Sequence, residues 1–367
     1  MIIKESSLEK TLEHLGKTAK DQFPEDHITK PFSDRYVAIA KKLNEDFHPN
    51  VLPGNISADG GLLTDHGPIH IRTVLNRAAD LLNNPNNKNK LSGYEIYLLM
   101  CAIHFHDLGN ALGREEHEKK IPKMMEAVKS HLGDSVEKSQ IRKIAETHGG
   151  KIGDDPDTIS YLDPSLTVFR KEIRPQALAA ILRFADELAD DSQRANRILQ
   201  QLDAIPAQSE VFHKYAECLH SVNVRDECKS VELTFSVDAA DLVKKFGKYN
   251  KETKTVEYGY ILDEIFSRTL KMHRERIYCN RFMAPIVHVK SIIVRIQVSK
   301  PDEKIGESLP RIDYKLEDSG YPDSPVTGIY AIARELNAWG ETRLSLNGER
   351  FAKFLCEAGH AKVAEHE

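Results

Sequence analysis

Long hydrophobic runs are missing from this sequence of 367 residues. Its apolar stretches stay far below the ~20 residues that a membrane-spanning helix needs. The N-terminal stretch MIIKESSLEKTLEHLGK carries alternating charges and has no apolar core of the kind that defines a signal peptide. We therefore expect a cytoplasmic protein without a membrane partner.

Cysteine is scarce as well, and the net charge is small. The five cysteines are scattered and form no C-x-x-C pair, which argues against a disulfide framework and against a zinc finger. A net charge of −5 offers polyanions no overall attraction, so any nucleic-acid binding must be local. The composition, 40% hydrophobic and 29% charged, is that of a globular protein, and ~150 residues per domain suggests about two domains.

Between about residues 60 and 200, apolar residues recur with the period of a helix, and no strand is required. Ser92 and Glu95 have the spacing of a capping box at the start of one helix, and Gly109 is expected to end it. Pro122 predicts an irregularity, whereas Pro175 suits the first turn of a helix. The predicted helices cover 69–82, 96–109, 114–132, 137–148 and 175–191.

After about residue 205 the apolar residues alternate, which predicts antiparallel strands over 219–224 and 231–237. A helix over 256–282 and a third strand over 287–299 complete a small α+β module. Residues 300–328 are expected to form a linker, and 329–365 a helical tail docked by Trp339, Phe351, Phe354 and Leu355. The predicted fold is mainly α, a helical bundle followed by a small α+β module with an antiparallel sheet. The predicted domains are an N-terminal helical segment (1–58), a helical domain (59–203), the α+β module (204–300), and a linker with a C-terminal helical tail (301–367).

Six histidine and aspartate residues in the helical region are candidate ligands for a divalent ion. They suit Mn, Mg, Fe, Co, Ni and Zn, among which the sequence does not choose. His106 and Asp107 are adjacent at a predicted helix end, where both side chains can face one ion. Asp186 borders the apolar face of its helix, and a carboxylate there needs a partner because an unpaired buried charge is very unfavourable. The six candidates are His70, His106, Asp107, His117, His148 and Asp186.

The order of these residues resembles the HD superfamily of metal-dependent phosphohydrolases, whose pattern is H, then HD, two further His, and D. The resemblance spans about residues 60–195, through HIRTVLNRA, AIHFHDLGN, GREEHEKK, ETHGG and FADELAD. It implies that the bundle is an HD-type domain in which His70, His106, Asp107 and Asp186 hold one ion. It also implies that Asp107 bridges to a second ion held by His117 and His148, and that Asp107, His117 and His148 are catalytic. In many relatives a doubled histidine occurs near the fourth position, whereas here Gly149-Gly150 follows His148.

Four residues near these ligands in the sequence are candidates for binding substrate. Arginine offers a planar fork to phosphate oxygens and lysine a point charge. The four candidates are His66, Arg72, Lys151 and Arg183. The expected activity is hydrolysis of a phosphoester of a nucleotide or oligonucleotide by a metal-activated water.

Two alternatives stay open at this point. The protein could be a nuclease or phosphodiesterase acting on single-stranded nucleic acid, or a regulatory module that binds a nucleotide without hydrolysing it. A homo-oligomer is also open. Other polar residues are expected to be structural: His104 should point away from the site, His131 should compensate a helix dipole, and Asp190 is undecided. The basic stretch 271–281 is expected to be an exposed helix face rather than a phosphate-binding patch.

Overall fold

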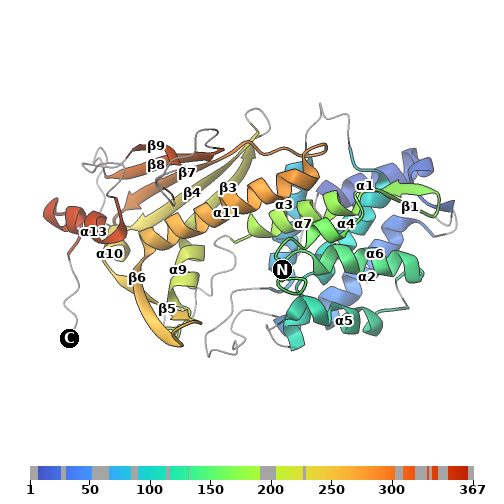
Figure 1. Ribbon diagram of the computed structural model, residues 1–367, viewed down its shortest axis with the longest axis horizontal. Helices are drawn as coiled ribbons and strands as arrows, with labels where there is room; N and C mark the ends of the chain where they lie inside the picture. The colour runs from blue at the N-terminus through green and yellow to red at the C-terminus, as the bar shows by residue number, and fades with distance from the viewer. Residues whose placement is uncertain are drawn as a thin grey trace. The chain divides into compact units, whose positions relative to one another are not determined.

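The computed structural model describes residues 7–25, 30–51, 66–83, 90–112, 116–130, 132–190, 204–225, 229–301, 309–318, 329, 333–337 and 346–362. These residues form two compact units (Figure 1). The helical unit contains the described residues up to 51, from 66 to 189 and from 276 to 288. The sheet unit contains those from 190 to 275 and from 289 onward. The predicted fold class, mainly α with an α+β module, is confirmed.

Helix α4 is the centre of the helical unit, and all of its residues are buried. Its sequence, GYEIYLLMCAIHF, is apolar on all sides, as expected of a helix surrounded by others. Six helices contact α4. They are α1 (Ser7–Thr18), α2 (Phe32–Asp46), α3 (Pro68–Leu82), α5 (Ile121–Ala127), α6 (Ser135–Glu146) and α7 (Pro175–Glu187), around α4 (Gly93–Phe105).

The start of α4 was predicted correctly, but its end was not. The Glu95 backbone N–H donates to Ser92 Oγ (3.2 Å), and the Ser92 N–H donates to Glu95 Oε2 (2.9 Å). The helix ends at Phe105, and Gly109 lies in the following 3-10 helix, Leu108–Leu112. A Cβ atom on Gly109 would be 1.8 Å from the carbonyl oxygen of His117. The glycine therefore allows two backbone segments to approach closely, instead of capping a helix.

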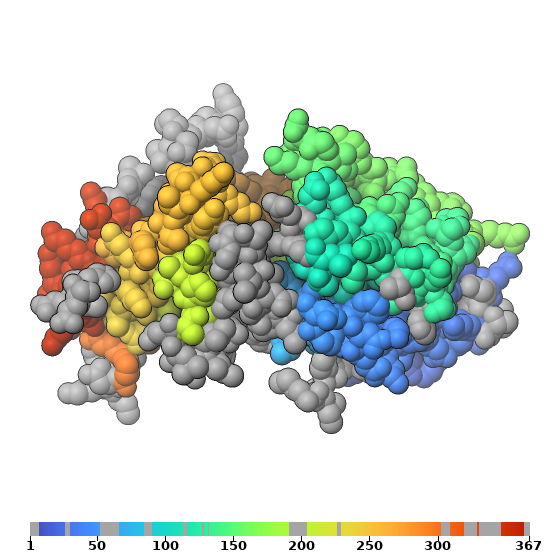
Figure 2. All heavy atoms as spheres, turned by 90° about the horizontal axis from the view of Figure 1, so that it is seen from below, coloured from blue at the N-terminus to red at the C-terminus, as the bar shows by residue number. Residues whose placement is uncertain are grey.

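The N-terminal helices α1 and α2 are an integral part of the helical unit. Figure 2 shows the blue residues of the N-terminal helices lying against blue-green residues of the same unit. Arg35 Nη2 of α2 donates to Glu137 Oε1 of α6 at 2.6 Å, and both side chains are buried. Tyr94 and Tyr97 on α4 also donate to Glu137, at 3.2 and 3.1 Å. These partners satisfy a charge pair that would otherwise be very unfavourable inside the bundle.

Three further secondary-structure predictions in the helical unit are wrong. In place of one helix over 114–132, the described residues form a short 3-10 helix, His117–Lys120, followed by α5. Pro122 lies in the first turn of α5, where its missing N–H does no harm. Strands β1 (Leu166–Val168) and β2 (Lys171–Ile173) form a hairpin where no strand was expected. Helix α7 ends at Glu187 instead of at 191.

The sheet unit is built on five strands in the order β3-β4-β7-β8-β9. All neighbouring pairs are antiparallel except β4–β7, which is parallel. A parallel pair needs a crossover connection, which includes helix α11 (Ile261–Met283). The strands are β3 (Leu219–Arg225), β4 (Ser230–Asp238), β7 (Ser291–Ser299), β8 (Arg311–Glu317) and β9 (Ala333–Asn337).

Several predictions for the C-terminal region need correction. The predicted helix over 256–282 begins at Ile261, because β6 (Thr255–Tyr260) pairs with β5 (Lys245–Asn250) as a second hairpin. The predicted linker contains β8, and the predicted helical tail contains β9. The tail is helical only in α13 (Gly348–Glu357), where Phe351 and Leu355 are buried, whereas Trp339 is outside the described residues. The short helices α9 (Glu210–Cys218) and α10 (Ala239–Leu242) complete this unit.

The basic stretch 271–281 lies on α11 and is not simply an exposed face. His273, Arg276 and Cys279 are buried, and residues from 276 onward belong to the helical unit. There, the Tyr278 hydroxyl donates to Asp157 Oδ1 at 2.9 Å. Among the described helices, none combines the length and the apolar character needed to cross a membrane.

Candidate metal centre

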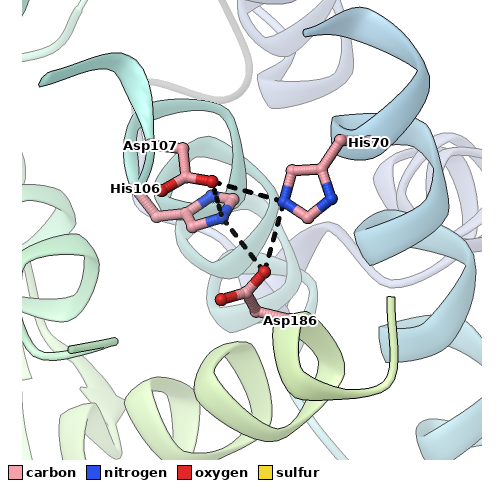
Figure 3. Close-up of side chains that lie close together, drawn as sticks. All are labelled: His70, His106, Asp107 and Asp186. Atoms are coloured by element: carbon pink, nitrogen blue, oxygen red, sulfur yellow. Dashed lines mark ion pairs between the residues drawn. The ribbon is translucent and has the colours of Figure 1, made fainter. Parts of the chain in front are cut away.

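Four of the predicted ligands meet inside the helical unit (Figure 3). His70 comes from α3 and Asp186 from α7, while His106 and Asp107 directly follow α4. His70 Nε2 is 3.3 Å from Asp107 Oδ2 and 3.2 Å from Asp186 Oδ1. His106 Nε2 is 3.4 and 3.6 Å from the same two oxygens. The four side chains thus converge on one point.

The other two predicted ligands form a second group around the opposite oxygen of Asp107. Asp107 Oδ1 is 3.3 Å from His117 Nε2 and 3.7 Å from His148 Nε2. The two histidine nitrogens are 3.2 Å apart. Asp107 therefore belongs to both groups, one through each carboxylate oxygen.

The spacing of these atoms fits a divalent ion. Ligand atoms at about 2.1 Å from an ion are separated by roughly 3.0 to 3.4 Å along the edges of its coordination polyhedron. The His–Asp and His–His separations given above, 3.2 to 3.7 Å, are close to this range, and all the ligand atoms of each group lie within 4.8 Å of one another. Imidazole and carboxylate are ligands that suit Mn, Fe, Co, Ni and Zn, and carboxylate also suits Mg.

The hydrogen bonds of the histidines point to the same conclusion. His106 Nδ1 is 2.7 Å from the Ile103 carbonyl oxygen, and His148 Nδ1 is 2.6 Å from that of Ala145. A carbonyl only accepts, so each Nδ1 carries a proton and each Nε2 is the ring nitrogen that faces the centre. His70 Nε2 and His106 Nε2 are buried and make no hydrogen bond to any described residue. A cation would satisfy these nitrogens.

The electrostatics of the centre also favour positive charge. Burial opposes ionisation of Asp107, yet His106 and His66 hold the pKa of Asp107 well below its usual range. His106 and His70 do the same for Asp186. Burial alone would lower the pKa of His106, but the Asp107 and Asp186 carboxylates raise it to about 10. In the metal-free protein a proton on His106 thus takes the place of a cation.

This proton makes metal binding depend on pH. Since the folded pKa of His106, about 10, lies above its ordinary value of 6.5, protonation stabilises the metal-free fold fully below pH 6.5. That stabilisation is lost as the pH rises towards 10. A metal ion must displace the proton, so the apparent affinity for Mn²⁺ should rise about tenfold per pH unit above neutrality. Calorimetry at pH 7 and 8 in two buffers of different ionisation enthalpy measures both the affinity and the released proton. Equal affinities without proton release would contradict this assignment.

The family model described as HD-CE matches residues 61–268. This span covers more than half of the chain and includes all six predicted ligands. The chain belongs to the HD-CE family. No curated protein and no solved structure matches it. Membership of the HD-CE family and the buried His/Asp cluster are together consistent with a metal-dependent hydrolase of the HD type.

The four predicted substrate-binding residues of this HD-CE protein lie in different surroundings. His66 is buried at the centre, with Nδ1 2.7 Å from Asp107 Oδ2. Arg72 forms an ion pair with Glu9 of α1. Lys151 is exposed, three residues after His148.

Arg183, the fourth of these residues, lies on α7, one turn before Asp186. Its Nη1 is 3.3 Å from Thr158 Oγ1, and its guanidinium lies 4.7 Å from the centre of the Tyr278 ring. The structure therefore brings His66 into direct contact with a predicted metal ligand and gives Arg72 and Arg183 other partners.

Sequence reasoning missed two residues that hold the ligands of the HD-CE centre. Asn110 Nδ2 donates to Asp107 Oδ1 at 3.1 Å, and Glu118 Oε2 is 3.3 Å from His117 Nδ1. Both fix the orientation of a ligand. Asn110 lies three residues after Asp107 and Glu118 directly follows His117, and this closeness to the candidate ligands is the sequence signal that identifies them.

The remaining polar residues mostly have roles outside the centre. His104 points away from it and contacts Tyr36 and His48, as expected. Asp190 forms an ion pair with Arg268 within the sheet unit. His131 is outside the described residues.

Proposed function

We propose that this HD-CE protein is a divalent-metal-dependent phosphohydrolase that cleaves a phosphoester of a nucleotide or an oligonucleotide. The observation that carries the proposal is the arrangement around Asp107. Each oxygen of this one carboxylate faces a separate set of ligands, and each set is able to hold an ion. Paired ions with a shared ligand are typical of sites that cleave phosphate esters in line.

Bound ions would polarise phosphoryl oxygens and lower the pKa of a water molecule, which is the chemistry that phosphoester hydrolysis needs. The residues of the chain hold this arrangement in place. Asp107 joins the two sets, and His117 and His148 present their Nε2 atoms on one side of it. We assign these three residues as the catalytic group. His66, bound to the other oxygen of Asp107, is placed to contact the substrate at the centre.

Substrate would approach from the more exposed side of the centre. The Asp186 and His117 side chains are 25% and 20% exposed, whereas those of His70 and His106 are completely buried. Lys151 lies three residues after His148, and Arg183 lies three residues before Asp186. We assign both to bind phosphate. Arg72 already pairs with Glu9, and its role is considered below.

A panel of phosphoesters tests the proposal. Protein stripped with a chelator and reloaded with Mn, Mg, Fe, Co or Ni should hydrolyse at least one nucleotide or oligonucleotide, and the stripped protein should not. Lys151→Gln should raise KM for this substrate by roughly tenfold, as expected for loss of one charged contact. Lys129→Gln, which removes another exposed lysine, should leave KM unchanged.

The other outcomes of the panel identify the alternatives. Salt-sensitive binding and cleavage of single strands, without hydrolysis of free nucleotides, would make the protein a nuclease or phosphodiesterase. Nucleotide binding without turnover in any metal would make it a regulatory module and would refute the proposed hydrolysis.

A further inference from the structure

A hydrogen-bonded chain of buried and half-buried polar side chains begins on α1, ahead of the span that matches the HD-CE family. Glu9 on α1 forms an ion pair with Arg72 of α3 through its Oε2 atom. Its other oxygen, Oε1, accepts a hydrogen bond from the Tyr36 hydroxyl of α2 at 3.1 Å. Glu9 thus links three helices of the helical unit.

Two histidines continue this chain. The Tyr36 hydroxyl is 3.0 Å from His104 Nε2, and His104 Nδ1 is 3.2 Å from His48 Nε2. Tyr36, His104 and His48 are at most 2% exposed. Both rings are buried and hydrogen-bonded to each other, and burial disfavours a second proton, with its charge, on either ring. Each imidazole therefore carries one proton.

Glu9 sets the direction of every hydrogen bond in the chain. Arginine stays protonated, so its partner Glu9 is a carboxylate and only accepts. Tyr36 must donate its single proton to Glu9, and His104 must then donate to Tyr36 through Nε2–H. His104 Nδ1 is left as an acceptor for His48 Nε2–H. One carboxylate on α1 thereby fixes the tautomers of two buried histidines.

The hydrogen-bonded chain reaches two of the three helices that position the first set of metal ligands, α3 and α4. Arg72 follows His70 by two residues on α3, and His104 precedes His106 by two residues on α4. Figure 3 shows His70 and His106 facing each other, and their ring centres are 5.5 Å apart. A change in the spacing of α3 and α4 would alter this distance directly.

His48, the last residue of this hydrogen-bonded chain, also lies close to the metal centre. His48 belongs to the 3-10 helix His48–Val51. This helix packs against the 3-10 helix Leu108–Leu112, which directly follows Asp107. The Val51 carbonyl accepts a hydrogen bond from the His66 N–H at 3.2 Å, and the His66 side chain binds Asp107. The segment His48–Val51, at the end of the hydrogen-bonded chain, therefore supports His66 at the metal centre.

We propose that α1 and α2 are a functional part of the metal centre and that Glu9 is its positioning residue. Through the chain from Arg72 to His48, Glu9 holds α3 and α4 at the spacing that His70 and His106 need to share an ion. This inference rests on the metal centre of the proposed function and is independent of the substrate.

Binding of Co²⁺ tests the proposal, because its visible absorption reports the geometry of the ligands without any turnover. Glu9→Gln keeps the shape of the side chain but removes its charge. The amide can donate as well as accept, so the direction of the hydrogen bonds along the chain is no longer fixed. The substitution should weaken Co²⁺ binding by about 10- to 100-fold, the effect typical of residues that orient metal ligands, and shift the absorption spectrum. Glu13→Gln, one turn along α1 in an exposed pair with Lys17, is the matched control and should change neither.

A second pair of variants separates positioning from stability. Tyr36→Phe and Tyr97→Phe each remove one buried hydroxyl, but Tyr97 donates to Glu137 and is outside the chain. Both should lower the melting temperature, and only Tyr36→Phe should shift the Co²⁺ spectrum. Wild-type affinity and spectrum in both Glu9→Gln and Tyr36→Phe would overturn the proposal, as would equal shifts in Tyr36→Phe and Tyr97→Phe.

Two further results separate this proposal from the proposed function. A wild-type protein that binds no Co²⁺ would overturn the metal centre and this inference together. A wild-type protein that binds Co²⁺ and hydrolyses nothing would refute only the hydrolase, and the variants would still decide the role of Glu9.

Discussion

Asp107→Asn should remove both metal ions and abolish hydrolysis in one step. An asparagine amide presents one oxygen and one NH₂ group, so it can no longer offer an anionic oxygen to each set of ligands. Histidines on both sides of Asp107 then lose the shared carboxylate that draws cations to the centre. Several kcal/mol of transition-state stabilisation by the ions would be lost, which corresponds to about a thousandfold or more in rate. Elemental analysis of the purified protein and the phosphoester assay measure the two losses.

Asp190→Asn is the control for this prediction. Asp190 lies one turn after Asp186 and pairs with Arg268, so its substitution removes a nearby carboxylate outside the ligand sets. Metal content should stay at the wild-type level in this variant. If Asp107→Asn retained the wild-type metal content, Asp107 would not be a ligand and the centre would have to be reassigned.

Gly109→Ala should remove the second metal ion while leaving the first. The added Cβ would be 1.8 Å from the His117 carbonyl oxygen and 3.1 Å from its Cα, and neither backbone atom can rotate away. The segment that carries His117 must therefore shift, which separates its Nε2 from Asp107 and His148. Overpacking of this kind costs about 1–3 kcal/mol of stability. Metal content should fall from two ions to one per chain, and the rate should fall with it.

Gly149→Ala is a demanding control, because Gly149 directly follows the ligand His148. A Cβ there would meet no atom within 4 Å, so metal content and stability should not change. Calorimetric titration with Mn²⁺ distinguishes one site from two, and thermal unfolding measures the loss of stability. Two intact sites in Gly109→Ala would show that the His117 segment has room to move without losing its ligand.

The candidate metal ligands could be selected from the sequence because their order matches a known pattern and their helices are recognisable. His70, His106, Asp107 and Asp186 are separated by recognisable helices, and apolar residues around each show which face is buried. Their mutual distances depend on how the helices pack, which no local pattern reveals. The same limit applies to His48 and Tyr36, because their common hydrogen-bond partner, His104, lies 56 and 68 residues away in the sequence.

The errors in secondary structure have local physical causes. Gly109 looks like a helix stop, yet what it supplies is space for the His117 backbone, and close approach leaves no signal in the nearby sequence. The β1–β2 strands have only three residues each, too few for an alternating pattern. Strand β8 did carry such a pattern, with Ile312, Tyr314 and Leu316 buried, and the polar residues around it hid the signal.

The position of α11 affects where this protein can be truncated to give a folded fragment. The span that matches the family ends at residue 268, inside this helix, and begins after α1 and α2. A fragment cut at these limits would lack Phe32 and Ile39, which are completely buried, and Tyr278, which ties α11 to Asp157. The boundaries of sequence similarity in this protein are therefore not the boundaries of a folding unit, and a truncation designed from them would expose the core of the bundle.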